Sequence, residues 1–144
     1  MNFWDRRSKD PRFDQQILAD DYTLEHIMPQ KWKVHWSTIP VKQNSDGSQM
    51  SLEVARQDRE QKIYWIGNMT LLTGSLNSSL KNFHFEKKMN GEGRKKGIKE
   101  YASLQITSND IVKPFMNGIT IWDESNIETR TKNLTDEILN IWKV

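Results

Sequence analysis

The sequence predicts an α+β fold, in which two short strands and a helix form a small core and further helices surround it. Short runs at residues 22–27 and 68–73 have the composition of strands. Near the C-terminus, apolar residues recur at helical spacing from Ile127 to Trp142 and predict a long helix. No internal repeat is evident, so the 144 residues suit one domain, residues 1–144.

The elements of the N-terminal half follow from capping and turn residues. Residues 1–20 predict a helical extension that precedes the first strand. Residues 37–50 are polar and rich in turn formers, so we expect a loop insertion there. A helix is expected to begin at Ser51, whose hydroxyl can cap it, and to run to about Trp65 before Gly67 ends it.

The remaining elements are mainly helical. Residues 22–88 are expected to hold the strand–strand–helix core, with its helix over residues 76–81. Residues 90–93 predict a flexible stretch. Residues 98–144 form the predicted C-terminal helical part, with a short helix capped by Ser108 or Asp110 and a last helix from Asp123 or Ser125. The apolar stripe of the last helix favours core packing, and a partner-binding helix is the alternative.

The composition excludes several classes of protein. Hydrophobic residues make up 35% and charged residues 28%, which is typical of a soluble globular domain. The sequence has no apolar run long enough to span a membrane and no apolar leader, so we expect a cytoplasmic location without a membrane partner. The absence of cysteine excludes disulfides, thiolate catalysis and cysteine-based zinc sites.

Positive charge is concentrated in one segment of the chain. The formal net charge is only +2, but residues 81–99 contain seven basic and two acidic residues and so carry +5. Such asymmetry suits contact with a polyanion. A solvated, lysine-rich loop explains the same charges, and the sequence leaves both interpretations open.

Three short segments carry the residues of a candidate site. Residues 25–29 read Glu-His-Ile-Met-Pro, residues 67–72 read Gly-Asn-Met-Thr-Leu-Leu, and residues 76–82 read Leu-Asn-Ser-Ser-Leu-Lys-Asn. A strand with an acid–His pair, a second strand that opens with Asn and a helix that bears Asn together describe a ββα unit. Each segment carries little weight separately, and their order is what indicates a site.

This arrangement resembles the HNH, or His-Me finger, nucleases. The same segments, together with Phe-Glu-Lys-Lys at residues 85–88 and Ile127, Arg130, Leu134 and Trp142, resemble the C-terminal nuclease domain of GmrSD-type modification-dependent restriction endonucleases. The likeness extends from Leu24 to the end of the chain and omits residues 1–20 and 37–50. It implies a ββα-metal core and a metal-dependent hydrolase that nicks or cuts DNA in restriction and antiviral defence.

Phosphodiester hydrolysis suggests a role for each residue of these segments. A neutral imidazole can take a proton from water near pH 7, since its ordinary pKa is about 6.5, so we expect His26 to be the general base. A divalent cation would offset the charge that gathers on the phosphate. Glu25 and Asn77 offer the oxygen ligands that Mg²⁺ or Mn²⁺ prefers. We expect Asn68 to hold the loop or to orient His26.

Adjacent strand residues point to opposite faces, so Glu25 and His26 are expected where the strand gives way to the loop before Pro29. Phosphate contacts are expected from polar residues beyond Asn77, namely Lys81, Asn82, Lys87 and Lys88. Aromatic residues near the site loop, Trp32 and Trp36, are candidates for a nucleic-acid surface, whereas core positions are expected for Trp65, Trp122 and Trp142. Apolar neighbours favour packing roles for His35 and His84, and a metal ligand or DNA contact is the minor alternative for His84.

The resemblance also implies partners. DNA is the expected substrate, and an N-terminal nucleotide-hydrolysing, modification-sensing domain or subunit is the expected protein partner. This sequence has no Gly-x-x-x-x-Gly-Lys loop of its own, so we expect it to be the nuclease part, either as an excised domain or as a stand-alone form. Two alternatives stay open: a non-catalytic DNA-binding module of the same fold, and an RNA-cleaving, toxin-like nuclease.

Overall fold

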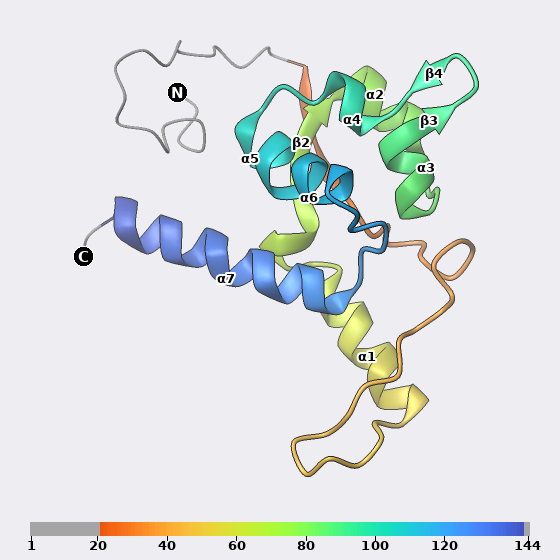
Figure 1. The fold of residues 1–144 in the computed structure, drawn as a ribbon, viewed down its shortest axis with the longest axis vertical. Coiled ribbons are helices and arrows are strands. Elements are labelled where there is room, and N and C mark those ends of the chain that lie inside the picture. Colours follow the sequence, from red (N-terminus) through yellow and green to blue (C-terminus); the bar gives the residue numbers. More distant parts are fainter. Residues whose placement is uncertain (1–20, 143–144) are drawn as a thin grey trace. The chain divides into compact units, whose positions relative to one another are not determined.

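The computed structural model describes residues 21–142 of the chain (Figure 1). Contacts group the chain into two compact units: unit 1 is Met1–Glu25 with Thr70–Thr120, and unit 2 is His26–Met69 with Ile121–Val144. The helical extension predicted for residues 1–20 lies outside the described residues. The single domain over residues 1–144 stays a prediction.

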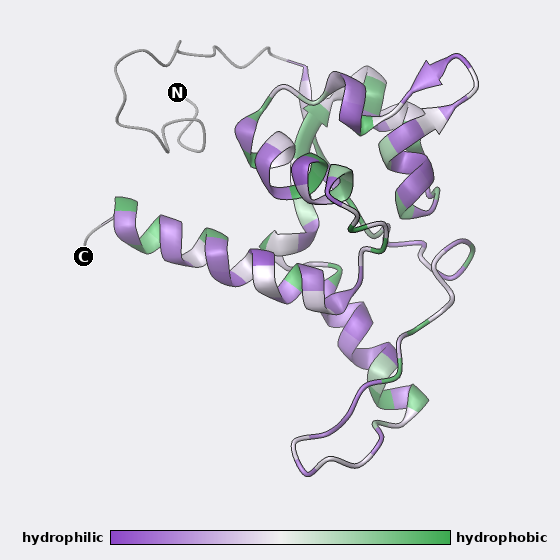
Figure 2. Cartoon of the chain, in the orientation of Figure 1, coloured by the Kyte–Doolittle hydropathy of each residue, from purple (hydrophilic) through white to green (hydrophobic). Residues whose placement is uncertain are grey.

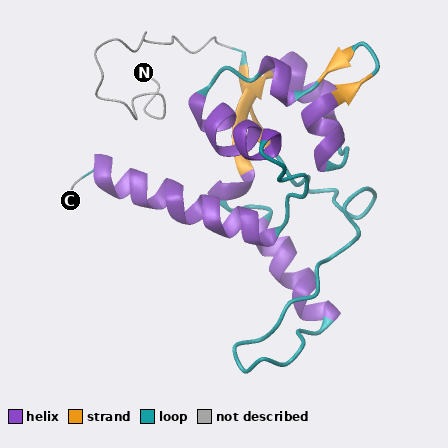
Figure 3. Cartoon of the chain, viewed as in Figure 1, coloured by secondary structure: helices purple, strands orange, loops and turns teal. Residues whose placement is uncertain are grey.

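A two-stranded sheet is formed by β1, Tyr22–His26, and β2, Met69–Thr73 (Figure 3). The strands run antiparallel: Gly74 N donates to Asp21 O at 2.8 Å at one end, and Ile27 N donates to Asn68 O at 2.9 Å at the other. Both predicted strands are therefore confirmed. The mixture of this sheet with helices agrees with the predicted α+β class.

In unit 1, a helix follows β2 without a loop. Helix α2 spans Gly74–Leu80, so it begins two residues before the helix predicted over residues 76–81. The chain continues through α3, Phe85–Asn90, and a hairpin of β3, Gly91–Glu92, and β4, Lys95–Lys96, with Gly91 opposite Lys96 and Glu92 opposite Lys95. Helix α4, Ile98–Tyr101, follows. Of the flexible stretch expected at residues 90–93, Asn90 thus ends α3 and the other residues belong to the hairpin.

Unit 1 ends in a nearly continuous helical segment. It comprises α5, Gln105–Thr107, a π-helical turn η3, Ser108–Val112, and α6, Lys113–Met116. The segment starts earlier than the predicted caps Ser108 and Asp110. The hydroxyls of Thr70 and Thr107 meet at 2.7 Å in the interior and tie this segment to β2.

In unit 2, helix α1 spans Leu52–Lys62. Ser51 is its N-cap, as predicted: its hydroxyl accepts a hydrogen bond from Val54 N at 3.3 Å. The helix ends before the predicted Trp65, and the chain then forms a 3₁₀ turn, η2, Ile66–Asn68. Gly67 lies so close to the C-terminal helix α7, Glu124–Ile141, that a Cβ there would overlap the carbonyl oxygen of Ile127, so this position requires glycine.

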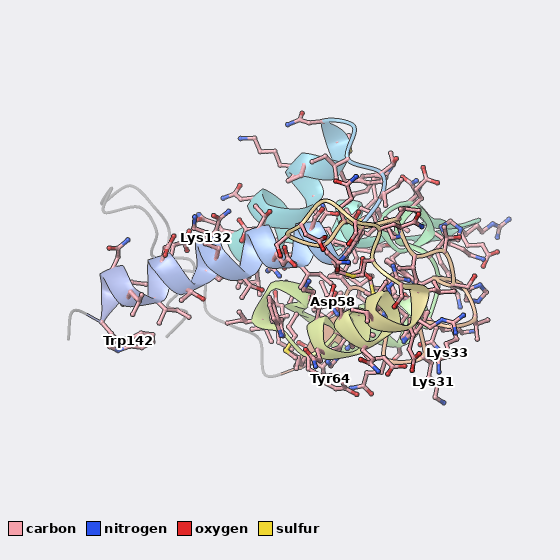
Figure 4. All side chains as sticks on the ribbon, turned by 90° about the horizontal axis from the view of Figure 1, so that it is seen from below. Lys31, Lys33, Asp58, Tyr64, Lys132 and Trp142 are labelled. Carbon is pink, nitrogen blue, oxygen red and sulfur yellow. The ribbon has the colours of Figure 1, made fainter. Side chains whose placement is uncertain are left out.

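Helix α7, Glu124–Ile141, is the predicted C-terminal helix. Ile127 and Leu134 are buried and confirm core packing over that part of the helix, but Trp142, which directly follows the helix, is 52% exposed (Figure 4). The apolar stripe therefore packs over only part of its length. None of the helices within residues 21–142 is long and apolar enough to cross a membrane.

The interior of unit 2 contains two of the tryptophans that we had expected on a nucleic-acid surface. Trp32 and Trp36 are 4% and 8% exposed, and the Arg59 guanidinium lies 5.2 Å from the Trp32 ring centre. Arg59 is itself buried and pairs with Glu124. The surface role for these tryptophans is therefore wrong. The expected core position holds for Trp122 but is wrong for Trp65, which is 40% exposed, and for Trp142.

The N-cap of α7 provides a test of this fold. Asp123 accepts hydrogen bonds from Ser125 N at 2.9 Å and Asn126 N at 3.3 Å, and Asp123 N donates to Asn126 Oδ1 at 2.9 Å. We expect Asp123→Ala to lower the free energy of unfolding by about 1 kcal/mol, measured by urea denaturation. Asp123→Ser keeps a capping oxygen and should recover most of the loss. Equal losses in the two variants would contradict a capping role.

Candidate functional site

Asn68 holds the loop that follows β1. Its side-chain nitrogen donates to Met28 O at 2.8 Å and to Ile63 O at 2.9 Å, and its Oδ1 accepts from Met28 N at 2.9 Å and from Trp122 Nε1 at 3.2 Å. Asn68 has no exposed surface. The Asn68 amide therefore forms hydrogen bonds with both the backbone N–H and the carbonyl of Met28, two residues beyond His26. Of the two roles expected for Asn68, these hydrogen bonds agree with loop holding, and its part in catalysis stays a prediction.

His26, the last residue of β1, is half-buried in unit 2. Its ring lies edge-on to the ring of Tyr64, with centroids 6.0 Å apart and an interplanar angle of 79°. Tyr64 is 60% exposed and follows α1 (Figure 4). Sequence reasoning missed Tyr64, because nothing in its neighbourhood indicates contact with a histidine 38 positions earlier.

Arg130 of α7 fixes the segment that carries Asn68. Its Nη1 donates to Gly67 O at 2.8 Å and to Met69 O at 2.7 Å, the carbonyls on either side of Asn68. Arg130 is 4% exposed, so these are interior contacts. The arginine that contributed to the family resemblance thus has a structural role: it anchors the turn from which the Asn68 amide projects.

In unit 1, Glu25 forms a buried ion pair. Its Oε1 accepts a hydrogen bond from Lys88 Nζ at 2.5 Å, and the two residues are 8% and 0% exposed. Burial raises the pKa of the Glu25 carboxyl, and the Lys88 ammonium opposes that rise. Burial likewise lowers the pKa of Lys88, and Glu25 opposes that shift. Each charge thus offsets much of the cost of burying the other.

The position of Lys88 does not agree with the expected phosphate contact, because its ammonium points into the interior. Phe85, Lys88 and Met89 are the buried residues of α3, and their spacing of three and four is that of one helix face. Lys87, on another face, is partly exposed. The sequence suggested that Lys87 and Lys88 are both surface charges. The helical spacing of Lys88 from Phe85 was the signal that could have identified Lys88 as the buried one.

Asn77 of α2 is held against β1. Its side-chain nitrogen donates to Thr23 Oγ1 at 2.9 Å and to Leu24 O at 3.1 Å. Thr23 and Glu25 are two residues apart in a strand and so project from the same face. The Asn77 amide therefore lies along the face of β1 that bears Glu25. Asn77 thus contacts the strand that carries Glu25, and their joint binding of a metal stays a prediction.

Comparison with known families assigns this chain. Residues 3–137 match the family described as GmrSD restriction endonucleases, C-terminal domain. The chain belongs to this family. The match covers residues 37–50 and nearly all of residues 1–20, so our expectation that the likeness omits them is wrong. No significant match is found among curated proteins or among solved structures.

Membership in the GmrSD C-terminal domain family indicates a nuclease module whose context is a restriction system. The match extends over elements of both units, so the family resemblance does not rest on the Glu25–Pro29 segment only. Within residues 21–142, no group of three His, Cys, Asp or Glu side chains could hold a metal ion. Any metal would need amide, water or phosphate oxygens in addition.

The carboxylate oxygen of Glu25 and the amide oxygen of Asn77 are ligand types that suit such a metal. The Lys88 pair uses Oε1 of Glu25, and the amide contacts of Asn77 use its nitrogen. Among the described residues, no hydrogen bond engages Oε2 of Glu25 or Oδ1 of Asn77. Mg²⁺ is commonly held by one or two protein oxygens, with waters and phosphates as its remaining ligands. The ammonium of Lys88 on the same carboxylate should make binding weak in the absence of DNA.

The other candidate residues lie at the surface of their units. Lys81 is exposed and Asn82 is half-buried, while Lys87 pairs with Glu92 at 2.7 Å. Their phosphate contacts stay predictions. His35 and His84 are both exposed, so the packing expected for them is wrong.

Proposed function

We propose that this chain is a metal-dependent DNA endonuclease, in which β1, β2 and α2 form a ββα-metal core. Family membership supports the nuclease activity. The structural observation that carries the proposal is the pair of hydrogen bonds between the Asn68 side chain and the Met28 backbone, because they fix the loop directly after His26. A histidine at the end of a strand, next to a rigidly held loop, is suited to positioned proton transfer.

In this mechanism His26 accepts the proton of the attacking water as its neutral imidazole. Asn68 and Arg130 keep the loop and turn beside His26 in place, and Tyr64 limits rotation of its ring. Glu25 and Asn77 would hold the cation through Oε2 and Oδ1. When bound, Mg²⁺ or Mn²⁺ supplies positive charge that offsets the charge gathered on the phosphate during hydrolysis.

The wider context is part of the same proposal. The cleavage is a nick or a double-strand cut, and the module acts in the cytoplasm with a nucleotide-hydrolysing, modification-sensing domain or subunit. Lys81, Asn82 and Lys87 contact phosphates, and Lys88 instead orients Glu25. The buried ion pair supports this change of role for Lys88.

A plasmid-cleavage assay tests the proposal. The wild type is incubated with supercoiled DNA and Mg²⁺ or Mn²⁺, next to His26→Ala and next to His35→Ala, an exposed histidine of the same unit that serves as the matched control. We expect His26→Ala to lower the cleavage rate by about 10²–10⁴-fold, the usual contribution of a general base, and His35→Ala to cut like the wild type. Chelation of the metal should stop cleavage.

Other outcomes separate the alternatives. A wild type that binds DNA but cuts it with neither metal would indicate a non-catalytic binding module. Cleavage of RNA but not DNA in parallel digests would indicate an RNA nuclease. Equal rates for His26→Ala and His35→Ala would remove His26 from the mechanism even if the nuclease activity stands.

A further inference from the structure

The basic segment of unit 1 surrounds a pocket. The pocket lies where the end of α2, the following turn, α3 and the β3–β4 hairpin meet, and its lining includes four lysines and one carboxylate: Lys81, Lys87, Lys95, Lys96 and Glu92. Lys87 pairs with Glu92, so three ammonium groups exceed the negative charge of the lining. Within residues 21–142, no ion pair engages Lys81, Lys95 or Lys96.

Phe83 lies at the centre of this arrangement. The ammonium of Lys87 is 3.9 Å from the centroid of the Phe83 ring, and that of Lys81 is 6.0 Å from it. The negative face of an aromatic ring attracts cations. The hydrogen bond from Lys87 is the main cause of the lowered pKa of Glu92, and the charges of Lys81 and Lys95 lower it further. Charges from three elements therefore act on one small region.

The hairpin is built into the fold and does not merely extend from it. Gly91 has a φ of +82°, and a Cβ there would overlap the carbonyl oxygen of Lys95. A Cβ at Gly97 would overlap the carbonyl oxygen of Met89, the penultimate residue of α3. These close approaches fix β4 to the end of α3 (Figure 1), and Figure 2 shows the hydrophilic character of β4. The backbone at Lys95 and Lys96 is thus held in place next to α3.

We propose that the pocket and the adjoining hairpin bind consecutive phosphates of the DNA backbone, with Lys81, Lys95 and Lys96 as the contacting residues. Lysine holds phosphates as a point charge, and such contacts position a nucleic acid without reading its sequence. The exposed Arg94 between the two strands adds charge of the same sign. The choice of DNA over other polyanions rests on the proposed nuclease function.

Binding measured without metal tests this surface independently of cleavage. The dissociation constant of the full chain for a short duplex is determined by fluorescence anisotropy at several salt concentrations. Each phosphate contact to duplex DNA contributes about 0.9 to the slope of log K against log salt. We therefore expect Lys95→Ala/Lys96→Ala to reduce the magnitude of that slope by about 2.

The matched control removes two lysines outside the pocket lining. Lys113 and Lys132 are both exposed, and Figure 4 labels Lys132 on α7. Lys113→Ala/Lys132→Ala should leave the slope close to that of the wild type. An equal decrease in both double variants, a hairpin variant with the wild-type slope, or no binding of DNA by the wild type would each overturn the proposal. The proposal would also be overturned if the hairpin substitutions weakened binding to anionic lipid vesicles but left binding to DNA unchanged.

The two proposals can fail separately. A wild type that cuts DNA while the hairpin variant keeps its salt slope contradicts only the binding surface. A wild type that does not cut, with a reduced slope in the hairpin variant, contradicts only the nuclease mechanism. Circular dichroism of both double variants should match the wild type, because the substituted side chains are exposed.

Discussion

Replacing Asn68 with alanine is expected to destabilise the protein more than most single substitutions. The substitution removes four hydrogen bonds and leaves the two backbone groups of Met28, the carbonyl of Ile63 and the indole nitrogen of Trp122 without this partner. A buried polar group without a partner costs about 1–3 kcal/mol, so the free energy of unfolding should fall by roughly 3–6 kcal/mol. Urea denaturation followed by circular dichroism measures this loss.

Two variants show whether the amide itself is responsible. Asn68→Asp keeps an acceptor for Met28 N and Trp122 but places a buried carboxylate against the two carbonyl oxygens, so near neutral pH its loss should be no smaller than that of Asn68→Ala. Asn109→Ala, at an exposed position, should change stability by no more than about 0.5 kcal/mol. A wild-type unfolding curve for Asn68→Ala would show that the loop after His26 is not held in this way.

The same substitution should separate positioning from catalysis. Asn68→Ala should lower both stability and DNA cleavage, because the loop beside His26 loses its support. His26→Ala should lower cleavage by a larger factor than Asn68→Ala does for an equal loss of stability, since the His26 ring is only half-buried. Cleavage assays at low temperature, where the weakened protein remains folded, keep the two effects apart.

The sequence predicted the elements whose signal is local. Strands β1 and β2, the Ser51 cap and helix α7 were all found near the predicted residues, because a short apolar run, one hydroxyl and a helical stripe are readable within each segment. The β3–β4 hairpin could not be predicted in this way. Its geometry depends on the approach of Gly97 to the carbonyl of Met89, and a backbone contact of this kind leaves no periodic pattern.

The candidate site was predicted unevenly for a related reason. Residue type and order identified His26, Asn68 and Asn77 as candidates, and the structure shows two of their side-chain amides holding backbone near β1. The chemistry assigned to these residues stays a prediction. Partners from distant segments, such as Lys88 for Glu25 and Trp122 for Asn68, were missed in these roles, because 63 and 54 positions separate the members of each pair.

Replacing Lys88 with methionine should expose the cost of the buried Glu25 carboxylate. Methionine fills much of the same space but carries no charge, so the carboxylate, 8% exposed, loses its counterion. Removal of one partner of a buried pair typically costs about 3–5 kcal/mol, and we expect a loss of this size near neutral pH. The double variant Glu25→Gln/Lys88→Met contains neither charge and should recover most of the stability.

The pH dependence of this loss has a defined sign. Burial raises the pKa of Glu25 in the folded state. In Lys88→Met the ammonium that opposes this rise is absent, so the pKa of Glu25 should rise further. The folded variant then binds a proton that the unfolded chain has released, so its stability falls as pH increases through this window. The difference in stability between Lys88→Met and the wild type should therefore be smaller near pH 5 than near pH 8. A loss that does not change with pH would indicate a packing defect instead.

The same variant tests the metal ligands. If Glu25 and Asn77 hold the cation, removal of the competing ammonium should strengthen binding, and Mg²⁺ should raise the melting temperature of Lys88→Met more than that of the wild type. The added stabilisation should disappear in Glu25→Gln/Lys88→Met and in Lys88→Met/Asn77→Ala. Equal Mg²⁺ effects in all four proteins would exclude Glu25 as a ligand. In that case the ion pair would serve only to hold β1, and the cation required for cleavage would have to bind through other oxygens.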